Sequence, residues 1–296
     1  MVRRVLARPA GRLGAGILIL IALLAILGPV LAPHDPLGST PDPLVGISGQ
    51  HWLGTDYLGR DVFSRLLHGS RESVVGSVEV ALVALVVGVI PGLLSVYLGR
   101  VFEWTALRLA DTLIALPFLV FAVAVTALLG NGITQAMLTV GVLVSPLFFR
   151  VARAATLTVA RSQYVEYGLI SGASIGWIIR RHVWAKVLPP IAVALAQTIG
   201  VGFIIVSSLT FLGIGVQPPA PTWGGLLASD LNYLNFQPFA PIAPAALIMA
   251  TVWACNLLAD AIRDVSGQAG RALTNTRRLR ARRAGGSQPV LAKGRS

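Results

Sequence analysis

Six long apolar stretches alternate with shorter polar segments along the chain. A helix that crosses a membrane needs roughly 20 predominantly apolar residues. Stretches of about this length or longer occupy residues 15–32, 74–98, 110–129, 133–150, 187–216 and 241–262. The first is longer than the apolar region of a secretory signal, so we interpret it as a retained span. The pattern therefore predicts an all-α membrane protein with six transmembrane helices.

The segment 151–186, between the fourth and fifth stretches, is polar and interrupted by glycine. With the residue before it, the segment carries six basic side chains, and burying them at mid-membrane would cost upward of roughly 15 kcal/mol. The segment is therefore not a seventh span. Val165, Leu169 and Ala173 recur at helical spacing, which predicts two short helices around Gly172.

Composition agrees with a membrane protein and orients it. Only 12% of the residues are charged, against about 25% in a typical soluble domain. Of the 24 Lys and Arg residues, all but Arg60, Arg65 and Arg71 fall on the side of the membrane that holds both termini. Because basic loops stay inside, both termini and segment 151–186 are predicted to be cytoplasmic. This topology accounts for the net charge of +12, so the excess does not indicate nucleic-acid binding.

The chain accordingly divides into three parts. A basic cytoplasmic tail at 1–14 precedes a transmembrane domain at 15–265, and a second basic cytoplasmic tail follows at 266–296. The residues alone leave two interpretations of segment 151–186 open. An amphipathic basic helix either docks onto a partner protein or lies on lipid headgroups.

Two segments on the opposite side of the membrane also have a physical interpretation. In 51–74, Thr55 or Asp56 is a candidate N-cap of an amphipathic helix on the outer membrane surface. Its apolar face comprises Leu58, Val62, Leu66 and Leu67, opposite Arg60, Asp61, Ser64 and Arg65. In 211–230, three prolines are predicted to end the fifth helix, Trp223 to sit at the membrane interface, and the glycines at 224–225 to form a tight turn.

The sequence offers little catalytic chemistry. It contains no Gly-x4-Gly-Lys-Ser/Thr motif for nucleotide phosphates. The four histidines, His34, His51, His68 and His182, do not show metal-ligand spacing. Cys255, the lone cysteine, is predicted to be a small buried hydrophobe. We therefore predict neither an enzyme nor a metal site, and no cofactor in this chain.

The segment EYGLISGASIGWIIRRHVWAKVLPP (166–190) resembles the EAA loop of the permease subunits of ABC importers. Glu166 and Gly172 match that loop at its usual spacing. Tyr167 and Gly168 replace its two alanines, and Trp184 begins the pair that replaces its Leu-Pro. In this family the loop is a lateral cytoplasmic coupling helix that sits in a groove of an ATPase. The resemblance assigns ATPase coupling to Glu166, Gly168, Gly172, Ala173, Ser174, Arg181 and His182.

Further stretches are similar to the C-type subunit of the dipeptide, oligopeptide and nickel permeases. They are HWLGTDYLGRDVFSRLLHGSRESV (51–74), FLGIGVQPPAPTWGGLLASD (211–230) and NLLADAIRD (256–264). The resemblance extends over about residues 15–265. It implies an extracytoplasmic gate or loop at Gly213, Gly215, Gln217, Pro218, Pro219 and Trp223.

This family also implies a set of partners in the bacterial inner membrane. They are a second related permease, two ATPase subunits or one fused ATPase that bind ATP and Mg, an extracytoplasmic solute-binding protein, and membrane lipid. The expected function is one half of the translocation pathway of an ATP-driven importer, with di- or oligopeptides as the cargo. Two alternatives remain: a secondary carrier or channel independent of ATP, and a membrane scaffold protein. Carboxylates and histidines are scarce within the spans, which argues against a proton-coupled carrier.

Overall fold

The computed structural model describes residues 1–130, 132–160, 162–216 and 219–285. Regular structure in these residues is entirely helical, apart from two isolated β-bridges in the loop after α2. The elements are α1 (Val2–Leu6), α2 (Pro9–Leu31), α3 (Val62–Leu94), α4 (Arg100–Ala115), α5 (Phe118–Leu129), α6 (Ile133–Ala160), α7 (Gln163–Ile170), α8 (Ile175–Ile178), the π-helical turn η1 (Ile179–Val183), α9 (Trp184–Phe211), α10 (Trp223–Leu231) and α11 (Ile242–Gly285).

Within the described residues, five helices are long and apolar enough to cross a membrane: α2, α3, α6, the continuous α8–η1–α9 helix and α11. A sixth crossing arises only if α4 and α5 count as one bent span. This corrects the third predicted span, 110–129, because the two helices meet at 98° within it. Pro117 explains the break: the residue before a proline avoids helical backbone angles, and Leu116 is extended.

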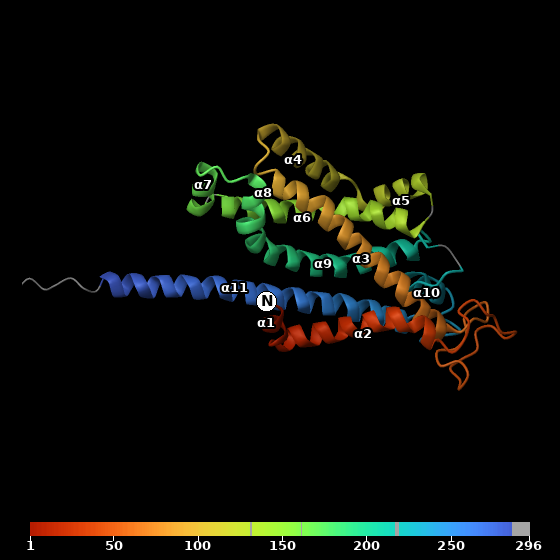
Figure 1. Ribbon diagram of the computed structural model, residues 1–296. Coiled ribbons are helices and arrows are strands. Elements are labelled where there is room, and N and C mark those ends of the chain that lie inside the picture. The colour runs from red at the N-terminus through yellow and green to blue at the C-terminus, as the bar shows by residue number, and fades with distance from the viewer. Residues whose placement is uncertain (131, 161, 217–218, 286–296) are drawn as a thin grey trace, which may run out of the picture.

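The bundle has two dissimilar ends (Figure 1). At one end lie α1, α7, α8 and the long continuation of α11, and we call it the basic end. At the other end lie the loop 32–61 and α10, and we call it the loop end. The α8–η1–α9 rod runs from the basic end to the loop end, so it connects the two regions that the sequence analysis singled out.

Helix α3 is central and packs against α2, α6, α9 and α10. Its contact with α6 is close because two glycines of α3 face that helix. A Cβ atom at Gly88 would lie 2.3 Å from the carbonyl oxygen of Ser145, and one at Gly92 would lie 2.8 Å from that of Phe149. Small residues at helix contacts let backbones approach in a membrane. Cys255 is buried in α11 as a free thiol, as predicted.

The rod that forms the fifth span begins earlier than the sequence suggested. Pro189 and Pro190 lie inside α9, although we expected them to mark its entry. Helical structure begins at Ile175 and continues through the π-helical turn. A π-turn inserts an extra residue into the helical repeat and is frequent at functional sites.

Candidate functional site

The segment that resembles a coupling loop turns at Gly172, as predicted, but only α7 is a separate short helix, because α8 is the start of the helix that continues to Phe211. Helix α7 ends at Ile170, and α8 begins at Ile175. Between them Gly172 has φ +80°, in the left-handed region that favours glycine. Ser174 is the N-cap of α8, where its side chain accepts a hydrogen bond of 3.3 Å from the N–H of Trp177.

This segment is anchored to the bundle on one side. Val165, Ile178 and Val183 are fully buried in a cluster with Phe148 of α6 and Val89 of α3. Burial of each such side chain contributes on the order of 2 kcal/mol. The segment is therefore held against the basic ends of α3 and α6.

The other side of the segment is exposed and apolar, and we call it the tip surface. Tyr167 and Ile170 are 70% and 77% exposed, and Trp177 is 52% exposed. A Cβ atom added to Gly172 or Gly176 would meet no described heavy atom within 4 Å. The tip surface, defined by these five residues, thus offers aromatic and aliphatic groups beside uncovered backbone.

The other residues of the predicted coupling set lie around this surface. Ala173 is half-buried against the cluster that anchors the segment. Arg181 is exposed, and the ring of His182 meets that of Trp177 edge-on, with centroids 5.2 Å apart. Glu166 and Gly168 lie in α7, but their burial is outside what the structure describes.

At the loop end, the chain after α9 turns at glycine rather than at proline. Helix α9 ends at Phe211, before the three prolines that we expected to end it. Gly213 and Gly215 follow with φ +75° and +89°, conformations that glycine adopts without steric cost. Pro219 is exposed. Gln217 and Pro218 lie outside the described residues.

Trp223 is a core residue, which corrects its predicted place at the membrane interface. It is fully buried, and its ring stacks on Phe203 of α9 with centroids 5.8 Å apart. Its indole N–H donates to the carbonyl oxygen of Leu66, and its backbone N–H donates to Ser73 Oγ, both at 3.1 Å. Trp223 therefore fastens α10 to α3 and α9.

The glycines at 224–225 lie within the first turn of α10, not in the tight turn that we predicted. A Cβ atom at Gly224 would lie 2.2 Å from the carbonyl oxygen of Ser207, so this glycine lets α10 pack directly on α9.

The predicted amphipathic surface helix at 51–74 is also wrong. Helix α3 starts at Val62 with Asp61 as its N-cap and continues without a break to Leu94. The supposed water-facing side is buried, whereas Leu58 of the supposed apolar side is 49% exposed. The buried polar residues are Arg60, Asp61, Ser64 and Arg65. Loop 32–61 folds over them, which a helical repeat cannot reveal.

Ion pairs replace water around these buried groups. Asp56 Oδ2 lies 2.8 Å from Arg60 Nη2 and 3.5 Å from Arg65 Nε. The other oxygen of Asp56 accepts backbone N–H groups of Leu58 and Arg60 at 2.9 Å. A buried pair is stable only with such additional hydrogen bonds. The i, i+4 spacing of Asp56 and Arg60 is the sequence signal that points to this pair.

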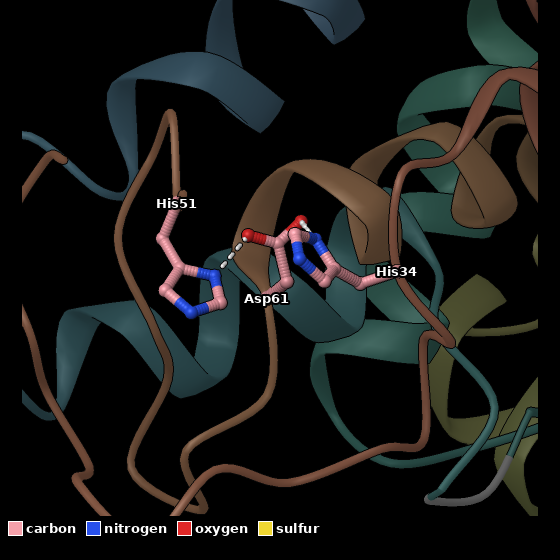
Figure 2. Close-up of side chains that lie close together, drawn as sticks. All are labelled: His34, His51 and Asp61. Atoms are coloured by element: carbon pink, nitrogen blue, oxygen red, sulfur yellow. Dashed lines mark hydrogen bonds and ion pairs between the residues drawn. The ribbon is translucent and has the colours of Figure 1, made fainter. Parts of the chain in front are cut away.

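A second cluster at the loop end joins His34, His51 and Asp61 (Figure 2). His51 Nδ1 lies 2.8 Å from Asp61 Oδ1, and His34 Nδ1 lies 3.8 Å from Asp61 Oδ2. Burial by itself raises the pKa of Asp61, but hydrogen bonds with Ser64 and His51 outweigh it, so the pKa is lowered. The sequence separations of 17 and 10 residues gave no signal of this cluster.

Residues 84–270 match the family model for the binding-protein-dependent transport system inner membrane component. That range covers more than half of the chain, including the tip surface, the rod and α10. The chain belongs to this family of transport permeases. Residues 1–45 of the permease match the N-terminal transmembrane domain of oligopeptide transport permease C.

Several proteins that are named for transport are similar to this chain over most of their length. The permease is 35% identical over 252 residues to the probable D,D-dipeptide transport system permease protein of Escherichia coli K12, covering 85% of each chain. It is 36% identical over 253 residues to a glutathione transport system permease protein of Pectobacterium atrosepticum, covering 85% of this chain and 84% of the relative. A di/tripeptide transport system permease protein of Pseudomonas aeruginosa is 33% identical over 254 residues, covering 83% and 84%.

Proposed function

We propose that this permease forms one half of the translocation pathway of an ATP-driven importer of di- or oligopeptides. The tip surface carries the proposal: a segment anchored in the core at Val165 and Ile178 presents exposed Tyr167, Ile170 and Trp177 to a partner. Large exposed apolar residues gathered in one place are typical of an interaction site. The partner is a cytoplasmic ATPase, which binds the ATP and Mg.

The basic residues support the orientation that this function requires. Arg180 and Arg181 flank the tip surface, and the N-terminal arginines lie at the same end of the bundle. With the basic end in the cytoplasm, the loop end faces the solute-binding protein. Both termini are then cytoplasmic, and a second related permease completes the pathway in the bacterial inner membrane.

In this mechanism, closure of the ATPase on ATP displaces the helices around Gly172. Because α8 continues through η1 into α9, the displacement reaches the spans directly. Glu166, Gly172, Ala173 and Arg181 transmit it, and hydrolysis returns the spans to their starting state. Peptides are the proposed cargo, since the relatives are named for D,D-dipeptide, glutathione and di/tripeptide transport.

The decisive experiment is purification of the permease from its native membrane in mild detergent, with mass spectrometry of the proteins that co-elute. Recovery of a second permease and of ATPase subunits is the expected result. Uptake of labelled dipeptides by reconstituted vesicles should then require internal ATP. Uptake without ATPase subunits would instead assign a carrier or channel. Recovery of the chain alone, without uptake, would assign a scaffold.

A further inference from the structure

We propose that His34, His51 and Asp61 form a binding site for a divalent transition-metal ion, with Zn²⁺ as the preferred ion, at the loop end of the permease. Each residue offers one ligand atom, and these atoms lie within 4.8 Å of one another. Two imidazole nitrogens and one carboxylate oxygen form a ligand set that Zn²⁺ takes at about 2.0–2.2 Å, with a further position open. Figure 2 shows the three side chains converging on a common space.

The distances place the cluster close to coordination geometry. Two ligand atoms bound to one Zn²⁺ are separated by at most about 4.3 Å, because each bond is about 2.1 Å long. His51 Nδ1 and His34 Nδ1 already lie 2.8 and 3.8 Å from the two oxygens of Asp61. The side chain of His34 is 42% exposed, so rotation of this ring supplies the remaining adjustment.

Surrounding hydrogen bonds orient the ligands, as the outer partners of metal ligands do in proteins. Ser64 holds two of them. Its backbone N–H donates to Asp61 Oδ2 at 2.8 Å, and its hydroxyl oxygen accepts the backbone N–H of His34 at 3.1 Å, which fixes the main chain that carries this imidazole. Asp61 is also the N-cap of α3 and is 2% exposed, so its carboxylate is fixed by a long helix rather than by a loop.

The chemistry of the set selects the ion. Imidazole suits zinc, copper, iron and nickel, whereas Mg²⁺ and Ca²⁺ prefer oxygen ligands. With neutral imidazoles the cluster has one negative charge, which a divalent cation offsets. The ion would tie the residues just after α2 to the middle of the loop and to the start of α3. Loop 32–61 would thereby be fixed at two points to the span that it covers.

The test uses the detergent-purified permease with the subunits that co-purify, stripped by a chelator and titrated with zinc chloride. Calorimetry and elemental analysis measure the affinity and the number of ions. We expect the wild type to bind one more Zn²⁺ per chain than His34→Ala, or to bind it at least 10-fold more tightly. Zinc should also raise the thermal midpoint of the wild type more than that of this variant.

His68→Ala is the matched control. His68 lies at the same end of α3, where its Nδ1 contacts the carbonyl oxygen of Ser64 at 3.0 Å, outside the three-residue cluster. Its zinc affinity should stay within about 2-fold of the wild type. Equal zinc binding by the wild type and His34→Ala would overturn the proposal and reduce the cluster to a hydrogen-bonded support of the loop. An equal loss in His68→Ala would overturn it as well.

Discussion

The two ends of the permease differ in which side chains they bury and which they expose. At the loop end, several charged residues are buried and paired within the chain, as Asp56 is with Arg60 and Arg65. At the basic end, the segment around Gly172 buries one side and leaves Tyr167 and Ile170 exposed. The loop end therefore depends on its own pairs for stability, whereas the tip surface can change with little cost to folding.

The largest expected effect is a loss of stability when an ion pair at the loop end is removed. Asp56→Ala leaves two buried guanidinium groups without their carboxylate, which costs about 3–5 kcal/mol. It also removes the acceptor for the N–H groups of Leu58 and Arg60. We expect a large fall in the thermal midpoint of the detergent-purified permease, or loss of folded protein.

Asp35→Ala is the control for this substitution. Asp35 lies in the same loop, but it is exposed, and its carboxylate accepts the local N–H of Leu37 at 2.9 Å. Its removal should change stability by no more than about 0.5 kcal/mol. Similar losses in the two variants would show that the whole loop is sensitive and that the buried pairs have no special weight.

A smaller effect comes from Asp230 in α10. Burial raises the pKa of its carboxyl to about 6 from the ordinary 3.8, although the hydroxyl of Ser229 and the charge of Arg65 act in the opposite direction. Between these two values the folded state binds the proton and the unfolded state does not. Stability therefore falls as pH rises from about 4 to about 6 and then levels off, by at most about 3 kcal/mol.

Asp230→Asn should abolish that decline and stabilise the permease above pH 6. Thermal midpoints at pH 4.5 and 7.5 measure the difference. Asp42→Asn, at an exposed position in loop 32–61, is the control and should keep the wild-type profile. Parallel profiles for the wild type and Asp230→Asn would contradict the prediction.

A substitution at the tip surface should have the smallest effect on stability but a clear effect on uptake. Gly176→Leu places a side chain in open space on a helix, where leucine is favoured over glycine by roughly 1 kcal/mol. The thermal midpoint should not fall. If the segment docks on an ATPase as proposed, peptide uptake should drop at least 10-fold, about 1.4 kcal/mol, because the added side chain separates the two surfaces.

Gly16→Leu is the matched substitution for this test. Gly16 lies in α2, and a Cβ atom there likewise meets no described heavy atom within 4 Å. Its uptake should remain near that of the wild type. Normal uptake by Gly176→Leu would remove the tip surface from the coupling mechanism, whereas equal loss in both variants would point to a general effect of bulk on the spans.

The sequence could predict what depends on local pattern. Apolar length located five spans, and the glycine at 172 located the turn between α7 and the long helix that begins at Ile175. Pro117 is a local signal of the break, since proline disfavours helix in the residue before it, whereas apolar length alone predicted one unbroken span at 110–129. Membrane orientation and the coupling roles of Glu166 and Arg181 stay predictions.

The remainder depended on contacts between distant segments. The helical repeat predicted that Arg60 and Asp61 face water. Both are buried, because a loop that the repeat does not describe folds over them. The sequence placed Trp223 at the membrane interface, but in the structure it contacts Ser73 and Phe203, which are 150 and 20 residues away in the chain. The cluster of His34 and His51 with Asp61 has the same origin.

The continuous rod from Ile175 to Phe211 has a mechanical consequence. Its longest part, α9, has 28 residues and is about 42 Å long at 1.5 Å per residue. A rotation of about 5° about one end of a helix of that length displaces its other end by roughly 4 Å. In the proposed mechanism, a small tilt about the left-handed turn at Gly213 would therefore move the end of α9 nearest the tip surface much further than the end at the turn.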